Sequence, residues 1–321
     1  MIRRRTLLGS ASLLLGAAPA WAQGRYPSRP VTVNVPFPAG GSTDIPTRLI
    51  LDRVAKDMGA SFVVQNQPGA GGRIGVGAAL RHKADGYSLV VVNHANTTIP
   101  LAFGQQLSYA PMDDIHYIAP FVTIPVTLMV NPRLPFATLK EFVAHVKQNP
   151  GKINIGTAGL GTMSHLAGEM FKQSAGLDVQ FVHYKGDAAS TVDVIAGHLP
   201  ALFIGGGSNF HTDGRLRALA VSSEKRLSSL ADVPSFTELG YSGVKAVAWN
   251  GLAAQRAVPD DIAQALNAGV QAALAQSEIT SALRERGFEP YVASRAVFAQ
   301  RVAEEVRTYQ ALRRATGIEL S

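Results

Sequence analysis

Residues 31–48 read VTVNVPFPAGGSTDIPTR, and this stretch decides the fold. Valine stands at every second position of residues 31–35 and Pro36 follows, which predicts a short strand. Residues 39–44 then give a glycine loop followed by serine, threonine and aspartate, which are side chains typical of a helix start. We therefore predict a strand, a glycine loop and a helix over residues 44–58. The free N–H groups and the dipole of that helix would form an anion site without a cationic side chain.

The same order returns in the second half of the chain. Residues 153–155 predict a strand, residues 156–162 (GTAGLGT) a glycine-rich loop and residues 164–175 a helix. Strands alternate with helices elsewhere in both halves, which is typical of α/β lobes with mainly parallel sheets. Two glycine-loop units, one in each half, predict two lobes and a cleft that holds an anion at both ends.

Composition limits the classes of function. The chain has 321 residues and is 46% hydrophobic, which is enough for a sizeable core and two lobes. Cysteine is absent, so disulfides, thiol nucleophiles, cysteine-bound metals and a lipid-anchored N-terminal cysteine are excluded. Without the arginines of residues 3–5, the net charge falls from +7 to +4, with 27 basic against 23 acidic residues. No basic run carries interleaved aromatic residues, so we expect neither nucleic acid nor a membrane surface as a partner.

Residues 1–22 are typical of an export signal. Three arginines at residues 3–5 precede an apolar stretch of about a dozen residues, which is too short to span a bilayer. Ala20 and Ala22 flank Trp21 in the small-x-small pattern of a cleavage site, so the mature chain would begin at Gln23, or two residues earlier. The arginines fit a twin-arginine signal and an ordinary signal equally well. We therefore predict a soluble protein that acts outside the cytoplasm.

Enzymatic motifs are weak. Residues 69–75 (GAGGRIG) carry Ile74 where a dinucleotide-binding loop has its last glycine, and no phosphate-binding P-loop is present. The nucleophile elbow of serine hydrolases is also missing. Ser164 adjoins His165 at a helix start, where neighbouring side chains point to different faces, so helix capping by Thr162 and Ser164 is the favoured interpretation.

No cofactor or metal site is predicted. The eight histidines lack the spacing of metal ligands. His94 and His165 stand beside candidate ligand loops, and their roles as ligand contacts stay open.

Seven motifs, spread over nearly all of the mature chain, carry a family resemblance. They are PFPAGGSTD at 36–44, NQPGAGG at 66–72, DGYSL at 85–89, GTAGLGTMSHLAGEMF at 156–171, HYKG at 183–186, RALAVSSEKR at 217–226 and DVPSFTELG at 232–240. In this order they resemble the extracytoplasmic solute receptors of tripartite tricarboxylate transporters, the Bug-type receptors.

The resemblance implies a hinged, two-lobe periplasmic binding protein of type II. Residues 23–122 and 246–321 would form lobe I, and residues 123–245 would form lobe II. It implies a monomeric, non-enzymatic receptor that captures a small organic carboxylate and presents its closed form to membrane permease subunits. Two alternatives stay open, an orphan sensor that acts on a signalling partner and, less favoured, a hydrolase that uses Ser164.

The resemblance, together with the loop argument, assigns ligand contacts in both lobes. Those of lobe I belong to the first glycine loop and to a polar cluster after the strand at 88–92: Phe37, Ala39, Gly40, Gly41, Ser42, Asp44 and Asn93. Those of lobe II belong to its own loops: Thr157, Gly161, Thr162, Ser164, His165, Asp187 and Gly205.

Two positions depart from the family pattern. Relatives usually carry a small or neutral residue at Asp187, and many carry an aspartate where this chain has glycines at residues 205–207. A carboxylate at residue 187 would repel an anionic guest unless it meets a ligand amine or hydroxyl, or faces solvent.

Overall fold

A computed structural model describes residues 26–317 of the protein. The predicted export signal lies outside the described residues. The strands are β1 (Val31–Val35), β2 (Phe62–Asn66), β3 (Ser88–Asn93), β4 (Ile115–Val130), β5 (Asn154–Thr157), β6 (Gln180–His183), β7 (Ala201–Gly205), β8 (Arg217–Val221), β9 (Val247–Gln255) and β10 (Glu289–Pro290).

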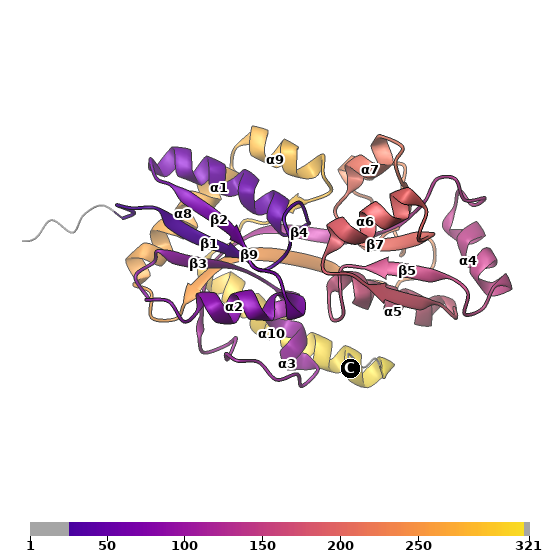
Figure 1. Ribbon diagram of the computed structural model, residues 1–321, viewed down its shortest axis with the longest axis horizontal. Coiled ribbons are helices and arrows are strands. Elements are labelled where there is room, and N and C mark those ends of the chain that lie inside the picture. Colours follow the sequence, from indigo (N-terminus) through magenta and orange to yellow (C-terminus); the bar gives the residue numbers. More distant parts are fainter. Residues whose placement is uncertain (1–25, 318–321) are drawn as a thin grey trace, which may run out of the picture.

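Helices pack around the strands in both halves of the molecule (Figure 1). The α-helices are α1 (Asp44–Met58), α2 (Arg73–Ala79), α3 (Thr98–Ala102), α4 (Leu139–Gln148), α5 (Met163–Ala175), α6 (Asp187–Ala196), α7 (Ser208–Thr212), α8 (Asp260–Leu274), α9 (Ser277–Arg284) and α10 (Arg295–Thr316). Short 3₁₀ turns are η1 (Ala70–Gly72), η2 (His94–Asn96) and η3 (Ser228–Leu230). Within residues 26–317, no helix is both long and apolar enough to cross a bilayer.

The strand order is β2-β1-β3-β9-β4-β7-β5-β6, with β8 and β10 also paired to β4. The outer strands are parallel, since β1 runs with β2 and β3, and β5 runs with β6 and β7. The central strands β4 and β9 are antiparallel to each other and to their neighbours β7, β8 and β3. The expectation of mainly parallel sheets therefore holds only for the outer strands. The reason is that the chain leaves the first lobe on β4 and returns on β9, so these two strands must run in opposite directions.

Two lobes result, and β4 and β9 pass between them (Figure 1). One lobe groups α1, α2 and α8 around β1 to β3, and the other groups α4 to α7 around β5 and β7. Strand β4 pairs with β9 as far as Pro125, and from Val126 it pairs with β7. The register of β4 shifts twice before this point, between Tyr117 and Ala119 and between Pro120 and Val122. Prolines and bulges bend a strand, so β4 is shaped for a crossing between lobes. The predicted lobe boundaries at 122/123 and 245/246 lie near this crossing and stay predictions.

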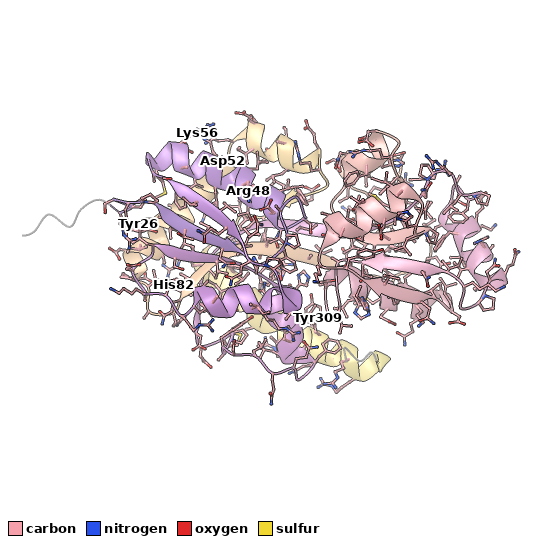
Figure 2. The ribbon with its side chains drawn as sticks, in the orientation of Figure 1. Tyr26, Arg48, Asp52, Lys56, His82 and Tyr309 are labelled. Carbon is pink, nitrogen blue, oxygen red and sulfur yellow. The ribbon has the colours of Figure 1, made fainter. Side chains whose placement is uncertain are left out.

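The helix after the first glycine loop is amphipathic. Ile50 and Val54 of α1 are fully buried against the sheet, whereas Asp52 and Lys56 are exposed. Figure 2 labels these two charged residues together with Arg48 along α1. The helix ends at Gly59, whose φ of 61° lies in the left-handed region.

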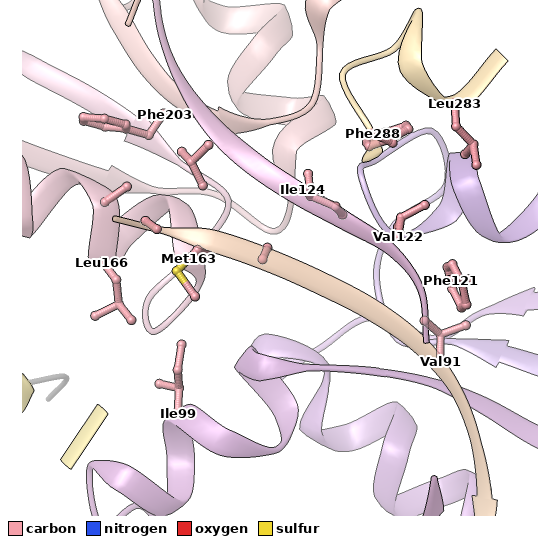
Figure 3. Packing of buried hydrophobic residues seen from close by; sticks show 14 of the residues in the cluster. Val91, Ile99, Phe121, Val122, Ile124, Met163, Leu166, Phe203, Leu283 and Phe288 are labelled. Atoms are coloured by element: carbon pink, nitrogen blue, oxygen red, sulfur yellow. The ribbon is translucent and has the colours of Figure 1, made fainter. Parts of the chain in front are cut away.

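A hydrophobic core continues along β4 and β9 from one lobe into the other (Figure 3). Val91 and Phe121 belong to it in the first lobe, and Leu166 and Phe203 in the second. All four side chains are at most 3% exposed. Close packing in both lobes therefore holds the strand ends, and the loops that follow them, in fixed positions.

Candidate functional site

A cavity of about 50 Å³, here called the inner cavity, lies between the lobes. Its lining from the first lobe and the crossing strands is Phe37, Pro38, Gly41, Ser42, Thr43, Asn93, His94, Ala95, Ile124, Val126, Ala248 and Asn250. Its lining from the second lobe is Ala158, Thr162, Met163, Ser164, Gly186, Asp187, Ala188 and Gly205. A guest in this cavity would touch both lobes, as the two glycine loops predict.

Three helix starts meet at the inner cavity. Thr43 is the N-cap of α1, Met163 is the first residue of α5, and Asp187 is the first residue of α6. Each of these helices has at least ten residues, and each directs the positive end of its dipole toward its N-terminus. The lining holds no lysine or arginine. The sequence predicted two helix starts at the cleft, those of α1 and α5, and the structure adds the start of α6 as a third.

Asp44 organises the first glycine loop from behind. Its Oδ2 accepts the N–H of Gly40 at 2.9 Å, and both its oxygens accept Nε–H of Arg48 at 3.0 Å. Burial alone would raise the pKa of Asp44, but the bonds from Arg48, Gly40 and Asn66 together lower it. Asp44 thus holds the Gly40 amide, and the next three residues, Gly41, Ser42 and Thr43, line the inner cavity.

The second glycine loop is held by its own side chains. Ser164 Oγ accepts the N–H of Ala158 at 2.9 Å and lies 2.9 Å from Oγ1 of Thr162. Thr162 donates in turn to the carbonyl of Gly159 at 2.7 Å. These bonds fix the loop as it enters α5. The capping interpretation is confirmed for Thr162, which is the N-cap of α5 and accepts the N–H of His165, whereas Ser164 lies inside the helix and accepts from the loop.

His165 is turned away from Ser164. Its Nδ1 accepts the N–H of Gly161 at 3.3 Å, and its Nε2 lies 3.6 Å from a carboxylate oxygen of Glu169. The hydrolase alternative needs a base beside the Ser164 hydroxyl. The hydrogen bonds of Ser164 go instead to Ala158 and Thr162.

The predicted contacts fall into three groups. Those that line the inner cavity are Phe37, Gly41, Ser42, Asn93, Thr162, Ser164, Asp187 and Gly205. Gly40 lines a second cavity of about 100 Å³, here called the outer cavity, whose wall also includes Phe210, Arg286 and Phe288. Those outside both linings are Ala39, Asp44, Thr157, Gly161 and His165.

Several lining residues were not predicted. Ile124, Val126 and Ala248 form an apolar wall on the two crossing strands. In the sequence they are ordinary strand residues, and only the crossing of the lobes gives them a cavity. No sequence motif marks Asn250 as a lining residue either. Its Nδ2 donates to the carbonyl of Ser42 at 3.0 Å.

Asp187 bridges the two lobes. Its Oδ2 accepts the hydroxyl of Ser42, and the residue is only 7% exposed. Burial raises the pKa of Asp187 to about 6, against the opposing effect of the Ser42 hydroxyl and of the N–H groups of Gly205 and Ser42. Its Oδ1 is buried without a hydrogen-bond partner of ordinary geometry. Asp187 belongs to the linings of both cavities, so the Ser42–Asp187 bond stands between them.

The glycine run after β7 serves a second contact between the lobes. Gly206 and Gly207 have φ values of 72° and 82°, in the region that favours glycine. The N–H of Gly207 donates to the carbonyl of Arg286 at 2.8 Å. A Cβ on Gly206 would lie 2.5 Å from Cε1 of Phe288. Close backbone approach between the lobes therefore explains why glycines stand here.

Comparison with known proteins agrees with this architecture. Residues 47–318 match the model of a family described as tripartite tricarboxylate transporter family receptor. The chain is 30% identical to protein BugT of Bordetella pertussis, over all of this chain and 99% of that protein.

Solved structures show the same fold. The structure of periplasmic binding protein BugD has a TM-score of 0.86 at 30% identity, over 92% of this chain and 99% of that one. A protein of R. palustris solved with adipate has a TM-score of 0.86 at 29% identity, over 92% and 99% of the two chains. MatC from Rhodopseudomonas palustris, solved with bound malate, has a TM-score of 0.82 at 29% identity, over 89% and 99%.

Proposed function

Because this chain belongs to the tripartite tricarboxylate transporter receptor family, we propose that it captures a small organic carboxylate between its lobes and delivers it to a membrane permease. The observation that carries the proposal is the inner cavity, which residues of both lobes line and where α1, α5 and α6 begin. N–H groups at helix starts bind anions without a counter-cation. The bound carboxylates of the adipate and malate complexes are consistent with this chemistry.

The ligand carboxylate is assigned to the first glycine loop. Gly41, Ser42 and Thr43 line the cavity, and their amides are not used by Asp44. Thr162 and Ser164 line the cavity from the opposite lobe, at the start of α5. Hydrogen bonds to a charged group are worth about 1.5–3 kcal/mol each, so a few of them, less the cost of ordering, allow micromolar or tighter binding, about −8 kcal/mol.

Delivery requires two states of the molecule. A ligand that touches both lobes stabilises the closed state, whose surface differs from that of the open state. We propose that permease subunits recognise the closed surface. The relatives described as periplasmic binding proteins support a periplasmic location, and export through residues 1–22 stays part of the proposal.

Calorimetric titration with mono-, di- and tricarboxylates, amino acids and aromatic acids tests the proposal. We expect saturable, one-to-one binding of at least one small carboxylate with micromolar or lower Kd. Absence of binding across the panel would contradict the capture of a carboxylate. Turnover of an ester or amide that Ser164→Ala abolishes would contradict it in favour of the hydrolase.

The permease step needs a separate measurement. We expect the ligand-bound protein, and not the ligand-free protein, to drive uptake through the large and small permease subunits reconstituted in vesicles. Ligand-dependent action on a signalling protein, with no uptake, would favour the sensor.

A further inference from the structure

Asp187 is an unusual lining residue for a carboxylate site, because its own side chain carries a negative charge when ionised. It is 7% exposed and lines the inner cavity at the start of α6. Burial of a carboxylate is costly unless its oxygens receive hydrogen bonds or a partner of opposite charge. One oxygen, Oδ2, receives the hydroxyl of Ser42, but the buried Oδ1 has no hydrogen-bond partner. The protein therefore offers Asp187 neutral donors only, and its Oδ1 has no hydrogen bond of ordinary geometry.

The charge of Asp187 is also unpaired in the inner cavity. The lining contains no lysine or arginine, and the groups that lower the pKa of Asp187 are neutral N–H and O–H donors. His94 is the other ionisable lining residue, and burial, with a smaller effect of Arg301, lowers its pKa to about 3, so it is neutral near pH 7. Arg286 lines only the outer cavity, where its Nη1 donates to the carbonyl of Ala282.

The two ends of the inner cavity thus favour different ligand groups. The loop of residues 41–43 offers amide donors to an anion, whereas Asp187 offers an acceptor with a negative charge. A second ligand carboxylate next to Asp187 would place two like charges together in a dry site, which is unfavourable. A ligand ammonium there would supply both the missing donor and the missing charge.

We propose that Asp187 makes this receptor selective for small amino carboxylates, whose ammonium group donates to Oδ1 of Asp187 while the carboxylate binds the amides of the first glycine loop. This inference rests on the proposed function, because it assigns the second end of the same cavity. It narrows the ligand from small carboxylates in general to small carboxylates that also carry an ammonium group.

Matched ligand pairs test the selectivity by calorimetry at pH 7.5. Each pair shares a carbon skeleton: γ-aminobutyrate against butyrate and succinate, and alanine and aspartate against propionate and succinate. For the natural chain we expect the best amino carboxylate to bind about tenfold or more tightly than its partners without the amine. Asp187→Asn keeps the shape and removes the charge, and we expect it to reduce that preference by about tenfold.

Asp193→Asn is the matched control. Asp193 lies on the same helix, outside both cavity linings, and its carboxylate pairs with Tyr184 and His198. We expect this variant to keep the preference of the natural chain, and thermal melts of both variants report whether they fold.

The outcomes separate the two proposals. Binding of carboxylates with no preference for the amine, or a preference that survives Asp187→Asn in a folded protein, overturns the role of Asp187 and leaves carboxylate capture standing. Binding of neither set overturns the proposed function itself, and this inference with it.

Discussion

Replacing Asp187 by asparagine should stabilise the ligand-free protein near neutral pH and have little effect in acid. The side chain keeps its size, and its amide oxygen still accepts the hydroxyl of Ser42. What changes is the charge of a group that is 7% exposed and lacks a cation partner in the inner cavity.

The magnitude follows from the pKa. Burial raises the pKa of Asp187 from the ordinary 3.8 to about 6. A raised carboxyl pKa means that the folded chain holds the proton more tightly than the unfolded chain. The associated stability is fully present below pH 3.8 and is lost as the pH rises through about 6. Each pKa unit corresponds to about 1.4 kcal/mol, so ionisation of Asp187 costs the folded protein about 3 kcal/mol.

Urea denaturation of the natural chain and Asp187→Asn between pH 4 and pH 8 measures this cost. We expect the variant to be more stable by about 3 kcal/mol at pH 8 and the difference to shrink toward zero at pH 4. His94, the other ionisable residue of the inner cavity, does not mimic this change, because burial lowers its pKa to about 3 and it stays neutral across the range. Carboxylates with lowered pKa values, such as Asp44, destabilise both proteins alike in acid.

Two results would refute the reasoning. A stability difference that does not vary with pH would mean that Asp187 is not the titrating group. A natural chain that is more stable than the variant at pH 8 would mean that the ionised carboxylate is well satisfied in the ligand-free protein, against the unpartnered Oδ1.

Three further substitutions test the remaining parts of the account. Gly41→Val should weaken ligand binding by roughly tenfold or more without lowering the melting temperature, because Gly41 lines both cavities and a Cβ there would lie 3.6 Å from the nearest atom, the Pro38 carbonyl. Gly243→Val, with no atom within 4 Å of its Cβ, is the calorimetric control, and equal affinity in the two variants would count against the loop. Gly287→Ala should keep the lobes apart and weaken binding by roughly tenfold, because its Cβ would lie 2.5 Å from Oγ of Ser208. Gly214→Ala has a similar φ of 76° and an open surrounding, so an equal loss there would show that backbone strain alone is responsible. Glu305→Ala should lower the free energy of unfolding by about 3 kcal/mol, since Trp249 Nε1 and Arg301 Nε lose their acceptor at 2.6 and 3.1 Å. Glu304→Ala, on the exposed side of the same helix, should leave the free energy of unfolding nearly unchanged, and a comparable loss there would argue against a special role of Glu305.

Local features of the chain were readable in the sequence. The helix predicted over residues 44–58 is α1 with the same bounds, because a glycine follows it and helix-start residues precede it. Residues of both predicted glycine loops line the inner cavity, since a strand, a loop and a helix are local patterns with local causes.

Relations between distant residues were not readable. Ser42 and Asp187 are 145 positions apart, and no periodicity indicates that their side chains meet. The glycines at 206 and 207 were noticed as a departure, but their reason lies in Arg286 and Phe288 of the other lobe. The antiparallel crossing of β4 and β9 depends in the same way on where the chain returns, which local propensity does not encode.

Capture of a carboxylate between the lobes is decided by a crystal structure of the protein with the small carboxylate that binds most tightly in the calorimetric panel. We expect a ligand carboxylate in the inner cavity, with its oxygens about 2.7–3.2 Å from backbone nitrogens of residues 41–43 and with both lobes in contact with the ligand. A carboxylate bound elsewhere on the chain, or held by arginine or lysine side chains away from the three helix starts, would contradict it.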